Sequence, residues 1–94
     1  MNVLDYELAE FTELMRSKLI AVAYKHGGLE SPNSVTSDNF DWCSNETASA
    51  IREHLLREIG EWLLAKDSNA SQKELVDIGN CAFILCAMSR KGAI

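Results

Sequence analysis

The 94-residue chain has a single proline, no low-complexity tract and none of the polar–apolar alternation that predicts β-strands. It is also poor in basic residues, with 9 Lys and Arg against 14 Asp and Glu and a net charge of −5. Proteins that bind a nucleic-acid backbone neutralise its phosphates with clustered Lys and Arg, and such clusters are missing here. We therefore expect no nucleic-acid partner.

Membrane spans and disulfides are not expected either. No apolar run reaches the roughly 18 residues of a membrane-spanning helix, and the first residues lack the basic and apolar stretches of a secretory signal. Cys43, Cys81 and Cys86 are odd in number and show no C-x-x-C spacing, so we expect reduced, buried thiols. These features predict a cytoplasmic protein with no membrane partner.

Apolar residues recur at helical spacing in three stretches, which predicts one all-α domain over residues 1–94. We expect an antiparallel bundle of three main helices near residues 5–25, 45–66 and 72–90. The apolar positions are Leu8, Phe11, Met15, Leu19 and Val22 in the first helix and Ile51, Leu55, Ile59, Trp62 and Leu63 in the second.

Polar and glycine residues mark the expected helix ends. His26-Gly27-Gly28 should stop the first helix, and residues 29–44 form a long loop. Ser44 is the expected cap of the second helix. Ser71 and Glu74 fit a capping box at the start of the third helix, after a turn over residues 66–70.

The third helix is apolar almost all round, since Asp77 and Asn80 are its only polar residues between Leu75 and Met88. A helix of this kind is buried on several sides. Three helices in so short a chain cannot cover it, so we expect a second copy to complete the bundle as a homodimer or homotetramer. The expected interface residues are Ile78, Phe83, Leu85 and Met88.

Two acidic pairs at i, i+3 spacing are the most informative pattern in the chain. Glu58 and Glu61 form E-x-x-E on the second helix, and Glu74 and Asp77 form E-x-x-D on the third. If the two helices fold back on each other, the four carboxylates converge on one site. Such a cluster of hard oxygen ligands is typical of a magnesium site.

Each acid also has an ordinary structural interpretation. Glu7, Glu10 and Glu13 show the same spacing on the first helix, where a solvated charged face is expected. Glu74 fits the capping box, and Asp77, which would be costly to bury alone, could pair with Lys73 or Arg57.

Gly60 and Gly79 interrupt these two helices beside the acids. A glycine costs about 1 kcal/mol against alanine inside an exposed helix, so each is expected to allow the close approach of another helix or a ligand.

The ligand types narrow the choice of metal. No E-x-x-H motif is present, which disfavours a di-iron carboxylate site; His54 follows Ile51 at that spacing. Zinc would require Cys or His ligands in a regular spacing. An all-oxygen cluster favours Mg²⁺, with Mn²⁺ as the alternative, and Mg²⁺ commonly shares carboxylates with substrate phosphates.

With these residues in view, the sequence resembles the MazG-like, all-α nucleoside triphosphate pyrophosphohydrolases. Their signature is E-x-x-E, a spacer of a dozen residues or more, and E-x-x-D, often followed three residues later by Asn. Here Glu58 to Glu61 is followed after twelve residues by Glu74 to Asp77, with Asn80 in the additional place. Residues 42–47 also resemble the family's tryptophan-to-threonine lead into the second helix, and residues 25–28 resemble a lysine and glycine turn of its phage-type branch.

The resemblance implies hydrolysis of a ribo- or deoxyribonucleoside triphosphate to the monophosphate and pyrophosphate with Mg²⁺. Glu58, Glu61, Glu74 and Asp77 would be the metal ligands. Orienting or deprotonating the attacking water is assigned to the pair Glu58 and Glu61, without a choice between them.

The expected substrate-binding residues are Asn80, Trp42, Lys25, His26 and Arg52. For Asn80 a polar contact between helices, and for Trp42 a lid over the core, are equally compatible with the sequence. The basic residues could also be simply solvated. The alternative function is a non-catalytic helical module for dimerisation or protein interaction.

Overall fold

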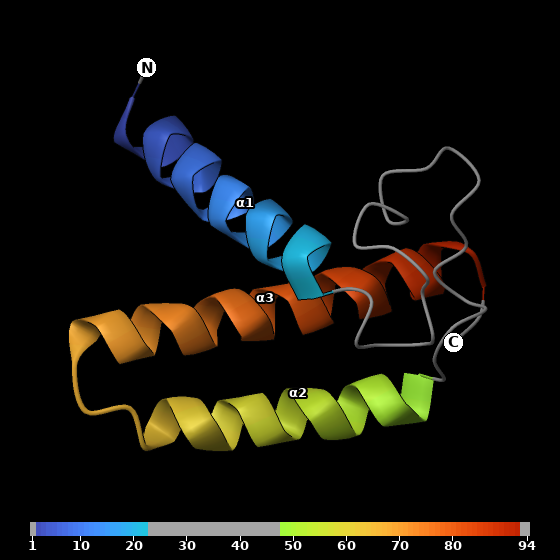
Figure 1. The fold of residues 1–94 in the computed structure, drawn as a ribbon. Coiled ribbons are helices and arrows are strands. Elements are labelled where there is room, and N and C mark those ends of the chain that lie inside the picture. The colour runs from blue at the N-terminus through green and yellow to red at the C-terminus, as the bar shows by residue number, and fades with distance from the viewer. Residues whose placement is uncertain (1, 23–47, 93–94) are drawn as a thin grey trace.

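The computed structural model describes residues 2–22 and 48–92, and over these residues the chain is all-helical and contains no strand. The helices are α1 (Val3–Val22), α2 (Ala48–Leu63) and α3 (Ser68–Arg90) (Figure 1). The predicted all-α class is therefore confirmed for the described residues.

Helices α2 and α3 form an antiparallel hairpin (Figure 1). Its connection spans residues 64–67, shorter than predicted, because Asp67 is the N-cap of α3. The Oδ1 of Asp67 accepts a hydrogen bond from the Ala70 backbone N–H at 2.8 Å. The predicted cap at Ser71 is wrong, since α3 begins one turn earlier. Glu74 therefore does not form a capping box with Ser71.

Ser71 instead joins the two helices. Its Oγ accepts a hydrogen bond from the Trp62 indole Nε1–H at 3.0 Å. Trp62 and Leu63 were expected on the buried face of α2, but their exposed fractions are 38% and 71%. They lie at the end of the hairpin that the connection closes, where only the short turn is available to cover them.

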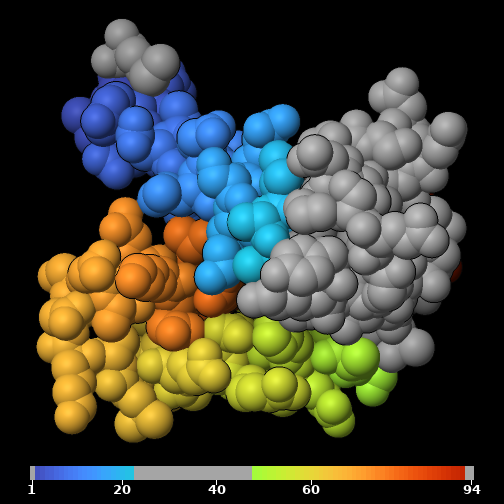
Figure 2. All heavy atoms as spheres, viewed as in Figure 1, coloured from blue at the N-terminus to red at the C-terminus, as the bar shows by residue number. Residues whose placement is uncertain are grey.

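Helix α1 crosses α3 obliquely and contacts it through its C-terminal half (Figure 1). Asn80 Nδ2 of α3 donates a hydrogen bond to the Met15 carbonyl of α1 at 3.0 Å. The expected apolar face is half-buried at Met15, Leu19 and Val22. Its N-terminal continuation is uncovered, because α1 diverges from α3 and leaves the hollow at the left of Figure 2.

The apolar core consists of Ile51 from α2 and Val76, Cys81 and Met88 from α3, each less than a tenth exposed. Neither Cys81 nor Cys86 is in a disulfide. Cys81 is buried as predicted, whereas the prediction for Cys86 is wrong, because this thiol is exposed. Five residues along a helix correspond to about 140° of rotation, which takes the second cysteine out of the core.

Several predictions lie outside the described residues: the loop at 29–44, the His26-Gly27-Gly28 stop, the Ser44 cap and Cys43. The described part of α1 starts two residues before the predicted position, with the Asn2 side chain accepting from the Asp5 backbone N–H at 2.8 Å. No helix in the described part of the chain is long and apolar enough to cross a membrane.

The two helical glycines differ in their surroundings. A Cβ at Gly79 would lie 2.8 Å from Phe11 Cζ and 2.9 Å from Met15 Sδ, so α1 and α3 meet closely there. Gly60 has no atom within 4 Å of such a Cβ, and the expected close approach at this residue is therefore not found.

Gly79→Val should lower the free energy of unfolding by about 1–3 kcal/mol, because the added side chain overpacks the contact with α1. Gly60→Ala should raise it by up to about 1 kcal/mol, since alanine favours the helix and meets nothing. Urea denaturation measures both changes. Equal responses of the two variants would show that α1 does not pack on Gly79.

Candidate metal centre

The antiparallel hairpin brings three of the four predicted ligands together. Glu58 and Glu61 are neighbours on one side of α2 because three residues span almost one helical turn. Glu74 approaches them from α3. One carboxylate oxygen from each of these three residues lies within 4.8 Å of the other two, which is close enough to share a cation.

Glu58 is the buried member of this group, with an exposed fraction of only 7%. Its burial is the main reason why its pKa is raised from 4.5 to about 8. Hydrogen bonds that the neutral carboxyl can donate to Glu74 and Glu61 add to this shift, as do the negative charges of Asp77 and Glu61. Without a cation, the site therefore favours a protonated Glu58.

Two carboxylate oxygens of the group lack hydrogen-bond donors. Glu58 Oε2 and Glu74 Oε2 are both buried and have no hydrogen-bond partner. The other Glu58 oxygen, Oε1, lies 3.3 Å from His54 Nε2, one helical turn earlier on α2. Buried carboxylate oxygens without donors are costly unless a proton or a cation compensates them, and hard oxygen ligands suit Mg²⁺. The residues present therefore fit the magnesium site that the sequence implies.

Asp77 occupies a corner of α3 between two contact surfaces. It lies about 60° around the helix from Glu74, which faces α2, and about 60° from Asn80, which contacts α1. Its Oδ1 is 3.6 Å from Lys18 Nζ of α1. Asp77 is not one of the three acids within 4.8 Å of each other, although its charge acts on Glu58.

The alternative of an ion pair between Asp77 and Lys73 or Arg57 is not found, because Lys18 is the ion-pair partner of Asp77. A lysine four residues before an acid is the less favourable helical orientation, and α1 supplies another ammonium group.

Asn80 takes part in a contact between helices. Its Nδ2 donates to the Met15 carbonyl, while its Oδ1 is buried and has no partner. Asn80 also lines a cavity of about 40 Å³ together with Asp77 and His54. This volume is sufficient for one or two waters but too small for a nucleoside base. The contact with α1 thus satisfies the NH₂ group of Asn80, as the alternative of a polar contact between helices predicted.

Of the remaining predicted substrate residues, one lies within the described part of the chain. Arg52 is exposed on α2, about 120° around the helix from Glu58. Trp42, Lys25 and His26 lie outside the described residues.

Lys18 and His54 are neighbours of the acids that the sequence did not predict. The four-residue spacing from His54 to Glu58 was a readable signal, because it places both on one helix face. Lys18 gave no local signal, since it reaches Asp77 only through the packing of α1 on α3.

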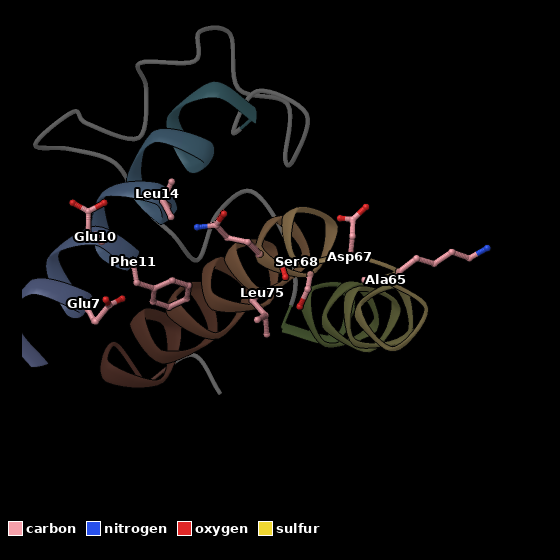
Figure 3. Close-up of a pocket in the computed structure, with 11 residues that line it drawn as sticks. Glu7, Glu10, Phe11, Leu14, Ala65, Asp67, Ser68 and Leu75 are labelled. Atoms are coloured by element: carbon pink, nitrogen blue, oxygen red, sulfur yellow. The ribbon is translucent and has the colours of Figure 1, made fainter. Parts of the chain in front are cut away.

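A larger groove, which is not lined by Glu58, Glu61 or Glu74, lies between the N-terminal half of α1 and the α2–α3 connection (Figure 3). It has a volume of about 620 Å³ and an apolar floor of Phe11, Leu14 and Leu75. Glu7 and Glu10 line it from α1, and both are exposed, as expected for the solvated acidic face of this helix. Among the described residues, Glu58 and Glu74 are the acids with a buried oxygen that lacks a hydrogen-bond partner, so the smaller acidic site is the candidate centre.

Comparison with known proteins gave no match to any family model, curated protein or solved structure.

The raised pKa of Glu58 makes stability depend on pH. Between about 4.5 and about 8 the folded protein binds a proton that the unfolded chain has lost. This stabilisation is complete below the lower value and disappears as the pH rises through the upper one. The free energy of unfolding of the metal-free protein should therefore fall between pH 5 and 8 by on the order of a few kcal/mol.

Glu58→Gln should flatten this dependence and make the metal-free protein more stable than wild type at pH 8, because the amide cannot ionise. Glu10→Gln is the matched control on exposed α1 and should keep the wild-type profile within about 0.5 kcal/mol. Urea denaturation in chelator at pH 5, 6.5 and 8 measures the profiles. A steep profile that persists in Glu58→Gln would assign the titration to another group.

Proposed function

We propose that this protein is a magnesium-dependent nucleoside triphosphate pyrophosphohydrolase that cleaves NTP or dNTP to the monophosphate and pyrophosphate. The observation that carries the proposal is the group formed by Glu58, Glu61 and Glu74, with a buried oxygen lacking a donor on each of Glu58 and Glu74. The resemblance of the E-x-x-E and E-x-x-D pattern to MazG-like enzymes supports the same reaction.

In this proposal Glu58, Glu61 and Glu74 hold the cation from two helices, and Asp77 completes the ligand set from its corner of α3. A bound Mg²⁺, or Mn²⁺ in its place, would neutralise charge on the phosphates and make water a better nucleophile. Glu58 and Glu61 are proposed to orient that water or take its proton. Because Glu58 is buried, its electrostatic interactions are screened less by water than those of the exposed Glu61.

Glu74→Gln should abolish pyrophosphate release, because it removes a ligand charge while keeping the shape of the side chain. The measurement is pyrophosphate release from a panel of canonical and modified nucleoside triphosphates with Mg²⁺. Glu13→Gln removes the same charge from an exposed position of α1 outside the acidic group and should leave the rate unchanged.

The wild-type protein should also melt at a higher temperature in Mg²⁺, because a ligand at a hundredfold excess over its Kd stabilises the folded state by about 2.7 kcal/mol. Glu74→Gln should lose this response. Equal rates for Glu74→Gln and Glu13→Gln, or no release by wild type on any triphosphate, would refute the enzymatic proposal.

The second candidate function is a non-catalytic helical module, favoured by the groove beside α1 with its exposed apolar residues Phe11, Leu14 and Leu75. Such a module would bind a protein partner and would show no stabilisation by Mg²⁺. The response of the melting temperature to Mg²⁺ therefore separates the two functions. In either case the exposed free thiol of Cys86 suits a reducing compartment such as the cytoplasm.

We also propose that the chain assembles as a homodimer or homotetramer. Leu4, Leu8 and Phe11 share one face of α1 and are 66%, 54% and 38% exposed. This face continues into Met15, which packs on Gly79 of α3. Of the interface residues expected on α3, Phe83 is 43% exposed, whereas Met88 is only 3% exposed and already covered. The exposed face of α1 is therefore the better supported interface.

Sedimentation at micromolar concentration should show a species larger than the 10.5 kDa monomer. Leu8→Glu should shift it towards monomer, because a charge in a dry helix contact is costly. Glu10→Gln, at an exposed position on the same helix, should leave the assembly intact. A monomeric wild-type protein would contradict this part of the proposal.

A further inference from the structure

Lys18 places a positive charge beside the acidic site. Its ammonium nitrogen is 3.6 Å from Asp77 Oδ1, and the two side chains are 44% and 24% exposed. Within the described residues, Lys18 is the one Lys or Arg that forms an ion pair with any of the four predicted ligands. It therefore provides the cationic side of an otherwise acidic site.

The position of Lys18 is fixed by packing as well as by charge. Met15 precedes it by three residues on α1 and accepts the hydrogen bond from Asn80, which follows Asp77 by three residues on α3. The two contacts are thus adjacent in the interface between α1 and α3. The close approach of Met15 to Gly79 belongs to the same interface. Lys18 would remain near the acids even if its ion pair with Asp77 were broken.

A structural ion pair is an incomplete explanation of this arrangement. A partly exposed pair contributes little to stability. A polyphosphate, by contrast, brings several negative charges to a site that already contains four carboxyl groups. Lysine is a common phosphate ligand, because its flexible chain delivers a compact positive charge. The exposed ammonium of Lys18 can leave Asp77 for such a ligand without unfolding α1.

We propose that Lys18 is a phosphate-binding residue of this site. It pairs with Asp77 in the free protein, and it contacts the phosphate chain of the substrate when Asp77 is taken up by the cation. This inference rests on the proposed function and names a residue outside the E-x-x-E and E-x-x-D pattern. It predicts opposite effects on the two ligands: loss of Lys18 should weaken polyphosphate binding while leaving the cation site intact or improved.

The test compares two probes on the full-length chain. Mn²⁺ alone is titrated by electron paramagnetic resonance, and inorganic tripolyphosphate with Mg²⁺ is titrated by calorimetry, so that the result does not depend on the preferred base. The variants are Lys18→Met, which keeps the length of the side chain, and Lys18→Arg, which keeps its charge. Arg16→Met is the control, because it removes the same charge from an exposed position of α1.

Lys18→Met should weaken tripolyphosphate binding about tenfold or more, which is the effect of losing one charge-assisted contact. Its affinity for Mn²⁺ alone should be unchanged or higher, because Asp77 has lost its competitor. Lys18→Arg should retain most of the tripolyphosphate affinity, and Arg16→Met should change it less than about twofold, as expected for a screened surface charge.

Wild-type tripolyphosphate affinity in Lys18→Met would overturn the inference and leave the metal site standing. Parallel loss of both ligands, or of the fold, in Lys18→Met would also overturn it, because that pattern indicates a structural ion pair. If the wild-type protein binds neither Mn²⁺ nor tripolyphosphate, the proposed function fails, and this inference fails with it.

Discussion

The register of the α2–α3 hairpin is the constraint on which the acidic site depends. Asp67 caps α3 at the turn, and the next contact is the hydrogen bond from Trp62 to Ser71. Four residues back along α2 and three residues further along α3 from that bond lie Glu58 and Glu74. One helical turn therefore separates the contact that sets the register from the carboxylates that meet. A shift of one residue in either helix would rotate an acid by about 100° and disperse the group.

Helix α1 completes the site through a different kind of contact. Gly79 removes a side chain where Phe11 and Met15 approach α3, and Asn80 donates to a carbonyl of the same helix. These contacts bring Lys18 to Asp77, which lies at the corner of α3 between α1 and α2. Helix α3 thus packs against both α1 and α2. Its nearly complete apolar character follows from this position, and burial on two sides accounts for much of the pattern that the sequence shows.

The periodicity of the sequence predicted the helical class, the hairpin and the convergence of Glu58, Glu61 and Glu74. These features depend on local spacing, which the chain displays directly. The cap at Asp67 was missed because Ser71 and Glu74 offered a competing capping box three residues apart. The exposed state of Cys86 and the pairing of Asp77 with Lys18 depend on how far one helix covers another. No local pattern encodes that quantity.

The acidic residues of the described helices differ in their burial, although their spacing along the sequence is the same. Glu7, Glu10 and Glu13 repeat every third residue on α1 and are exposed, so their charges are hydrated at little cost. Glu58 has the same spacing to Glu61, yet it is held against two other carboxyl groups with its Oε2 buried and unpaired. Replacing it by an apolar residue would relieve that repulsion. Local rules are commonly broken in this way where a site serves a ligand, and the divalent cation of the proposed function would offset burial and repulsion together.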